Sequence, residues 1–140
     1  MSECFTLFNN VGLVVPAMNH SVMEQTYIGT IFTVNNLACP VLLTPFKQIM
    51  WGAFMLFKKT ALNKVNNFSL DYPKASGEDI DMCFKLYESG VNIVVDKRSF
   101  IYHEWGSTGK RIYGDMERQK LYLENYEIFK KKWSHYTKNW

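Results

Sequence analysis

The sequence predicts a single α/β domain, because short apolar runs of strand length alternate along it with segments of helical periodicity. Apolar runs rich in β-branched or aromatic side chains occupy residues 11–15 and 50–57. A cluster of acids opens a helical pattern at residues 78–89, and another apolar run follows it. With 140 residues, the chain is large enough to bury one core and too small for two.

The composition limits what this domain can be. Apolar residues make up 47% of the chain and charged residues 21%, which is typical of a folded globular protein. The net charge of +3 is too small to indicate a nucleic-acid partner without a patterned basic face. The local basic run at residues 130–132 is expected on the solvated side of a terminal helix, with a contact to anionic lipid headgroups as the alternative.

Cysteine usage and hydropathy indicate the compartment. Cys4, Cys39 and Cys83 are odd in number, far apart and outside any Cys-x-x-Cys arrangement, so neither a disulfide framework nor a structural zinc site is expected. The longest apolar stretch, residues 49–57, is too short to cross a bilayer. These observations favour a cytoplasmic location with at most peripheral membrane association.

The N-terminal half is predicted to be rich in strands. Residues 11–15 form a buried strand that ends in a turn at Pro16, which cannot donate to a sheet ladder. Residues 17–47 are expected to be loops with short strands. Residues 50–57 form a second buried strand, in which Gly52 allows a backbone or a ligand to approach closely.

Helices are predicted at residues 60–65, where Thr60 is the expected N-terminal cap, and at residues 78–89. Acids in the first turn and Gly90 as a C-terminal cap support the second helix. The inward side chains are Ala61, Leu62 and Val65 in the first helix, and Ile80, Cys83, Phe84 and Tyr87 in the second. Two strands, a glycine-rich surface loop and a last helix follow, at residues 91–95, 99–103, 104–114 and 115–133.

Several short motifs follow one another in an order that matches one known family. They are Trp51-Gly52-Ala53-Phe54, Asn66-Asn67-Phe68, Glu78-Asp79-Ile80-Asp81-Met82-Cys83, Gly90, His103 in His-x-x-Gly-x-Ser, and Phe129-Lys130-Lys131-Lys132-Trp133. This series, over residues 11–133, resembles the second half of the family 2 glycosyltransferases. The resemblance implies a partial GT-A fold, a mixed sheet with flanking helices that lacks the N-terminal nucleotide-binding half.

The activity that the resemblance implies is inverting transfer of a sugar from a nucleoside-diphosphate sugar to the hydroxyl of a carbohydrate acceptor, with a divalent cation, Mn²⁺ or Mg²⁺. By the same resemblance, Asp79 is the general base, Glu78 helps to hold the acceptor, and His103 reaches the metal or the diphosphate. The family's Asp-x-Asp motif belongs to the nucleotide-binding half, so the resemblance implies either a partner chain that supplies this half or a longer protein of which this sequence is a fragment. A non-catalytic carbohydrate-binding or scaffolding remnant is the alternative.

The chain departs from the family pattern at two places. Asn66 and Asn67 stand where the family has Gly-Gly, and asparagine tolerates the left-handed backbone that glycine would adopt. Lys85 stands where the family has arginine. Since lysine cannot reproduce the bidentate arginine fork, a weaker salt bridge with Asp79 or Asp81 is expected.

Physical chemistry supports a base at this helix start. Inversion needs a carboxylate on the face opposite the leaving diphosphate, and such general-base help is typically worth ~10²–10⁴ in rate. A helix N-terminus stabilises the carboxylate by ~0.3–1 kcal/mol, which makes Asp79 a weaker base. Glu78 and Asp81 are expected to share one helix face, with Asp79 turned about 100° away, and simple capping explains either of the first two equally well.

Further residues are expected to contact the substrates. The expected acceptor-binding residues are Trp51, Gly52 and Asp81. Core packing is the alternative for Trp51, and a structural role is the alternative for Asp81. Lys110 and Arg111 are expected to neutralise the departing diphosphate or, alternatively, to be solvated charges.

Overall fold

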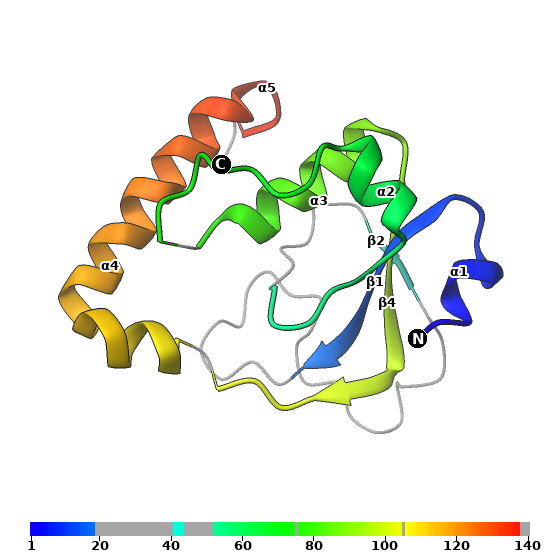
Figure 1. Ribbon diagram of the computed structural model, residues 1–140, viewed down its shortest axis with the longest axis horizontal. Coiled ribbons are helices and arrows are strands. Elements are labelled where there is room, and N and C mark those ends of the chain that lie inside the picture. The colour runs from blue at the N-terminus through cyan, green and yellow to red at the C-terminus, as the bar shows by residue number, and fades with distance from the viewer. Residues whose placement is uncertain (19–40, 44–51, 75, 105, 138–140) are drawn as a thin grey trace.

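The computed structural model describes residues 1–18, 41–43, 52–74, 76–104 and 106–137. The elements are α1 (Cys4–Leu7), β1 (Val11–Met18), β2 (Val41–Leu43), β3 (Leu56–Phe57), α2 (Lys59–Lys64), α3 (Glu78–Glu88), β4 (Asn92–Ile101), α4 (Ser107–Lys132) and α5 (Ser134–Thr137). Helices flank one small mixed sheet, which confirms the predicted α/β class (Figure 1). Most of the predicted loop region 17–47 lies outside the described residues.

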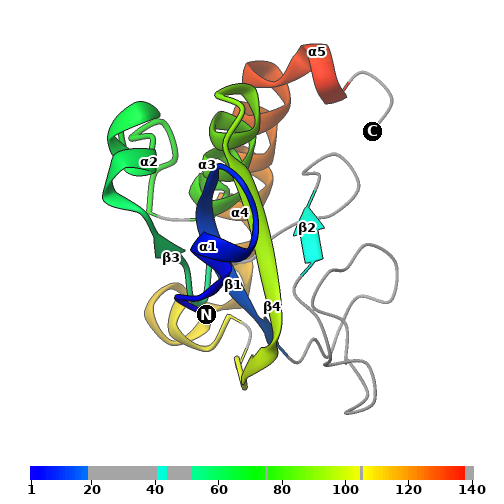
Figure 2. The same cartoon turned by 90° about the vertical axis from the view of Figure 1, so that its right-hand side faces the viewer.

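The strands form one mixed sheet in the order β2-β4-β1-β3, which Figure 2 shows from right to left. β1 and β4 are parallel neighbours at its centre, whereas β3 pairs antiparallel with β1 and β2 pairs antiparallel with β4. A parallel pair needs a crossover connection between its strands, and here that connection contains α2 and α3. α3 is thereby brought against the sheet.

The sheet buries apolar side chains on both faces. On one face, Cys4 of α1 packs against Val11, Val14 and Val94. The opposite face packs against α2 and α3 through Leu13, Val15, Ile93, Val95, Ala61, Val65, Met82, Cys83 and Leu86. Val11 and Val14 share a face because the register of β1 against β4 shifts just after Val11, so that simple alternation is broken.

α4 forms an outer layer on α3 (Figure 1). The fully buried Phe84 of α3 meets Phe129 and Trp133 of α4, with ring centroids 5.1 and 5.2 Å apart. Such aromatic pairs are worth about 0.5–1.5 kcal/mol beyond the area that they bury. α3 is therefore enclosed between the sheet and α4, so its N-terminus is held by contacts on two sides.

The strands differ from the prediction in three places. β1 does not turn at Pro16 but continues, because Pro16 pairs with Asp96 at a register shift, where a missing N–H is tolerated. The two strands predicted between residues 91 and 103 are one strand, β4. The predicted buried strand at residues 50–57 is described from residue 52 onward, and in that part only β3 is a strand; β3 is half-buried at the edge of the sheet, and Phe54 is 45% exposed.

The helices agree more closely. α2 and α3 lie where they were predicted, and Gly90 adopts the left-handed conformation of a C-terminal cap, with φ of 68°. Thr60 is not the cap of α2, because that helix begins at Lys59 and has no side-chain cap. In α3 the predicted inward Tyr87 is 40% exposed, whereas Met82 and Leu86 are buried.

The prediction of a surface loop at residues 104–114 is wrong. α4 begins at Ser107, and only Gly114, with φ of 73° and ψ of 169°, breaks the helical backbone. The kink separates a short helical segment at residues 107–113 from the long helix that was predicted from residue 115. Asn66 and Asn67, at φ of 61° and 59°, do adopt the left-handed backbone expected of them.

Candidate active site

Asp79, in the first turn of α3, has a carboxylate that two backbone groups hold. The N–H of Gly52 donates to Oδ2 at 2.7 Å, and the N–H of Ile80 donates to Oδ1 at 2.8 Å. A Cβ atom at Gly52 would lie 2.8 Å from the Cβ of Asp79, a distance that side chains do not tolerate. A group does approach Gly52 closely, but it is the side chain of Asp79 and not the predicted backbone or ligand.

The pKa of Asp79 is raised to about 6, and burial of its carboxyl group is the main cause. The negative charge of Glu78 raises this pKa further, while the N–H donors of Gly52 and Ile80 lower it. Burial therefore outweighs the helix N-terminus, which alone would make Asp79 a weak base. A carboxylate with a pKa near neutrality is suited to general-base chemistry.

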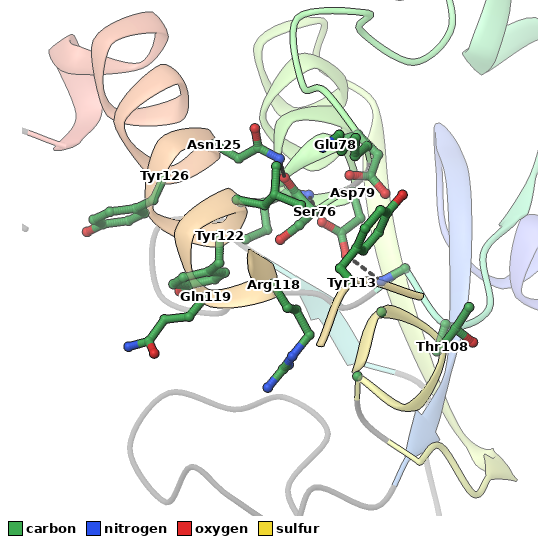
Figure 3. Close-up of a pocket in the computed structure, with 18 of the residues that line it drawn as sticks. Ser76, Glu78, Asp79, Thr108, Tyr113, Arg118, Gln119, Tyr122, Asn125 and Tyr126 are labelled. Atoms are coloured by element: carbon green, nitrogen blue, oxygen red, sulfur yellow. Dashed lines mark hydrogen bonds between the residues drawn. The ribbon is translucent and has the colours of Figure 1, made fainter. Parts of the chain in front are cut away.

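A cavity of about 900 Å³ opens beside this carboxylate. Its walls come from α3, from the segment that follows β4, and from α4 (Figure 3). In α/β sheets, ligands bind at the carboxyl ends of the strands, and His103, which follows the end of β4, lies at this position. The charged or ionisable lining side chains are Lys74, Glu78, Asp79, His103, Glu104, Asp115 and Arg118, besides three tyrosines.

The tyrosines give the cavity an aromatic side. Tyr113 precedes the kink in α4 and lies over the start of α3, near Glu78 and Asp79 (Figure 3). Tyr122 and Tyr126 lie further along α4, with parallel rings whose centroids are 6.3 Å apart. An aromatic surface opposite a carboxylate can hold a ligand that has both an apolar face and hydroxyl groups.

Asp81 lies elsewhere. It is fully buried and does not line the cavity. Its Oδ1 accepts hydrogen bonds from the Tyr72 hydroxyl at 3.1 Å and from the Trp133 indole at 2.8 Å, and it lies 3.0 Å from Nζ of Lys132. This burial contradicts the acceptor-binding prediction for Asp81 and supports its alternative, a structural role that joins α3 to α4.

Glu78 and Asp81 lie three residues apart in α3, as the expectation of a shared helix face requires, but their surroundings differ. Glu78 lines the cavity, whereas Asp81 is in the core between α3 and α4. Glu78 keeps one carboxylate oxygen, Oε2, buried without a hydrogen-bond partner among the described residues. This desolvated charge beside Asp79 contributes to the raised pKa of that group.

Of the other predicted site residues, some line the cavity and some do not. Gly52 and His103 line the cavity, whereas Lys110 and Arg111 are exposed residues that do not. Lys110 instead pairs with Asp115 at 3.4 Å. Trp51 lies outside the described residues. Nor do three or more histidine, cysteine, aspartate or glutamate side chains gather as a metal-binding group in the described ranges.

Sequence reasoning missed Arg118 and Asn125, as well as the three tyrosines of the cavity. Arg118 lines the cavity and packs over Gly106 and Gly109, where added Cβ atoms would lie 2.5 and 3.2 Å from its side chain. The two glycines were the available signal, but they were interpreted as loop residues. Asn125 is 1% exposed and donates hydrogen bonds to the loop that precedes α3.

No family model, curated protein or solved structure matches this chain. None of the helices in the described part combines the length and apolar composition that crossing a bilayer requires. The fold and the cavity together define a mixed α/β domain with a buried, ionisable carboxylate at the carboxyl edge of its sheet.

Proposed function

We propose that the chain is the acceptor-side half of an inverting glycosyltransferase of the GT-A type, with Asp79 as its general base. The observation that carries the proposal is the position of Asp79, a carboxylate of raised pKa fixed by backbone N–H groups at the wall of a large cavity. Glu78 and the tyrosines surround the place where an acceptor sugar would lie. The motif series that includes Glu78 and Asp79 supports the same reaction.

The proposed reaction balances with residues of this chain and two substrates. Asp79 takes the proton of an acceptor hydroxyl, whose oxygen attacks the anomeric carbon of the donor sugar. The bond between that carbon and the diphosphate oxygen breaks, and the nucleoside diphosphate leaves with the bonding electrons. Each carboxylate oxygen of Asp79 accepts one backbone hydrogen bond and keeps a further lone pair for the proton.

The donor side requires groups beyond the cavity described here. The nucleotide and a divalent cation would be bound mainly by a nucleotide-binding half, supplied by a partner chain, with His103 offering one nitrogen ligand. The described residues do not themselves complete a cation site. Arg118 is the guanidinium on the cavity wall, and it is better placed than Lys110 or Arg111 to meet a leaving diphosphate.

Calorimetric titration tests the proposal. UDP-, GDP- and dTDP-sugars with Mn²⁺ are titrated into the purified chain, alone and together with a candidate nucleotide-binding partner. Binding in at least one arrangement is expected, and absence of binding in both would contradict the transferase assignment.

Variants then test the base. With a partner that supports transfer, Asp79→Asn is expected to lower kcat by ~10²–10⁴ without loss of the fold. Glu124→Gln, which removes an exposed carboxylate of α4 that does not line the cavity, is the control and should retain most activity. Full activity of Asp79→Asn would remove Asp79 as the base.

A further inference from the structure

We infer that Asn125 of α4 is a positioning residue for Asp79, because it fixes the strained turn from which α3 begins. The catalytic consequence rests on the proposed function, whereas the structural coupling between Asn125 and Asp79 does not. Three parts of the structure are involved, namely the turn before α3, the side chain of Asn125 and the carboxylate of Asp79.

The turn before α3 has an unusual backbone. Lys74, Ser76 and Gly77 have φ of 59°, 88° and 105°, in the left-handed region that non-glycine residues rarely adopt. Such a backbone persists only where its surroundings hold it, and it is typical of functional sites. Gly77 is followed directly by Glu78, and α3 has no side-chain N-cap of its own. The start of the helix is therefore held by neighbouring elements.

The side chain of Asn125 holds this turn through hydrogen bonds. Its Nδ2 donates to the carbonyl of Ser76 at 2.7 Å and to the carbonyl of Pro73 at 3.2 Å, so one carboxamide spans the strained residues. Figure 3 shows the side chain reaching from α4 toward Ser76. Asn125 is 1% exposed, so water cannot easily replace it. A Cβ atom at Gly77 would lie 3.1 Å from Tyr72, which leaves the turn little room for another path.

The position of Asp79 depends on this turn. Asp79 comes three residues after Ser76 and must meet the N–H of Gly52 at 2.7 Å, across a contact with no room for a Cβ atom. If the turn relaxes, the start of α3 moves and this contact lengthens. A misplacement of about 1 Å at a catalytic group can cost on the order of 100-fold in rate.

The contact between Gly52 and Asp79 can be measured without any substrate. Asn125→Ala leaves every charged or ionisable side chain around Asp79 in place, namely Glu78 beside it, Lys74 before it, and His103, Glu104, Asp115 and Arg118 around the cavity. In ¹⁵N-labelled protein, the amide proton of Gly52 reports its hydrogen bond and, through a pH titration, the ionisation of Asp79. We expect Asn125→Ala to move this proton toward its random-coil shift and to reduce the change in that shift as Asp79 titrates near pH 6.

Controls separate positioning from general loss of stability. Thr137→Val removes a buried hydroxyl that bonds the Trp133 carbonyl at 3.1 Å, in α5, and should lower stability without moving the Gly52 signal. Asn125→Ser keeps one hydrogen-bond donor and should give an intermediate shift of the Gly52 amide proton. It takes the place of Asn125→Ala as the test variant if Asn125→Ala does not fold. An unchanged Gly52 signal in a folded Asn125 variant would overturn the inference and leave Asp79 as the proposed base. A moved signal without any sugar transfer would refute only the proposed function.

Discussion

Asp79→Asn should make the protein more stable at neutral pH, because the ionised carboxylate is held in the cavity wall at an energetic cost. The pKa of Asp79 is about 6 in the folded protein, against the ordinary aspartate value of 3.8 in the unfolded chain. Both states bind the proton below pH 3.8, so the folded protein has its full stability there. As the pH rises through 6, the unfolded chain has already ionised, and stability is lost.

The magnitude follows from the gap between these two values. At about 1.4 kcal/mol for each unit of pKa, ionisation of Asp79 lowers the free energy of unfolding by roughly 3 kcal/mol above pH 6, and about 2 kcal/mol of this is lost between pH 4.5 and 8. The residue keeps some exposure, so these figures are upper bounds. Asparagine removes the charge, but it presents an N–H to one of the two backbone donors, which costs about 1 kcal/mol.

Urea unfolding of the two proteins between pH 4.5 and 8 measures this effect. Near pH 4.5 the two free energies of unfolding should be nearly equal, and at pH 8 the Asp79→Asn protein should be more stable by about 2 kcal/mol or less. Asp115→Asn serves as the control, since Asp115 is exposed on the same cavity wall, and its difference from the parent should vary by less than about 0.5 kcal/mol. A pH-independent difference for Asp79→Asn would refute the reasoning.

Two further substitutions test the neighbouring contacts. Gly52→Ala should displace the carboxylate that its N–H holds and lower sugar transfer at least 10-fold. An activity equal to that of the parent protein would contradict the contact. Lys132→Met leaves the buried charge of Asp81 without its cation and should lower the free energy of unfolding in urea by ~1–3 kcal/mol. Lys131→Met, at an exposed position, should change it by less than about 0.5 kcal/mol. Equal losses for the two variants would mean that the ion pair adds no stability.

Local signals in the sequence predicted α3 and its surroundings well. The acids of its first turn, the glycine at residue 90 and the asparagines at residues 66 and 67 act through their own backbone and the adjacent turn, so their positions can be read without the rest of the fold. Glycines mark a loop less reliably. Gly106 precedes α4 and Gly114 only kinks it, because a single left-handed residue can begin or bend a helix without ending it.

Contacts between distant segments were not predictable in the same way. Helical periodicity gave the angle between Glu78 and Asp81 but not the neighbours, and α3 is covered on two sides, so one acid faces the cavity and the other the core. The cation beside Asp81 is Lys132, 51 residues away, whereas Lys85, the expected partner, donates to the carbonyl of Asn67. Such pairings depend on how α4 packs against α3.

Asp79 is a largely buried carboxylate at the wall of the cavity, and burial is what makes it ionise near neutral pH. A ¹³C NMR titration of protein labelled at the aspartate carboxyl carbons, with Asp79→Asn to identify the resonance, measures this directly. The structure predicts a midpoint at about pH 6. A midpoint near the ordinary aspartate value of 3.8 would mean that the carboxylate is solvated, and would contradict its role as a base tuned by burial.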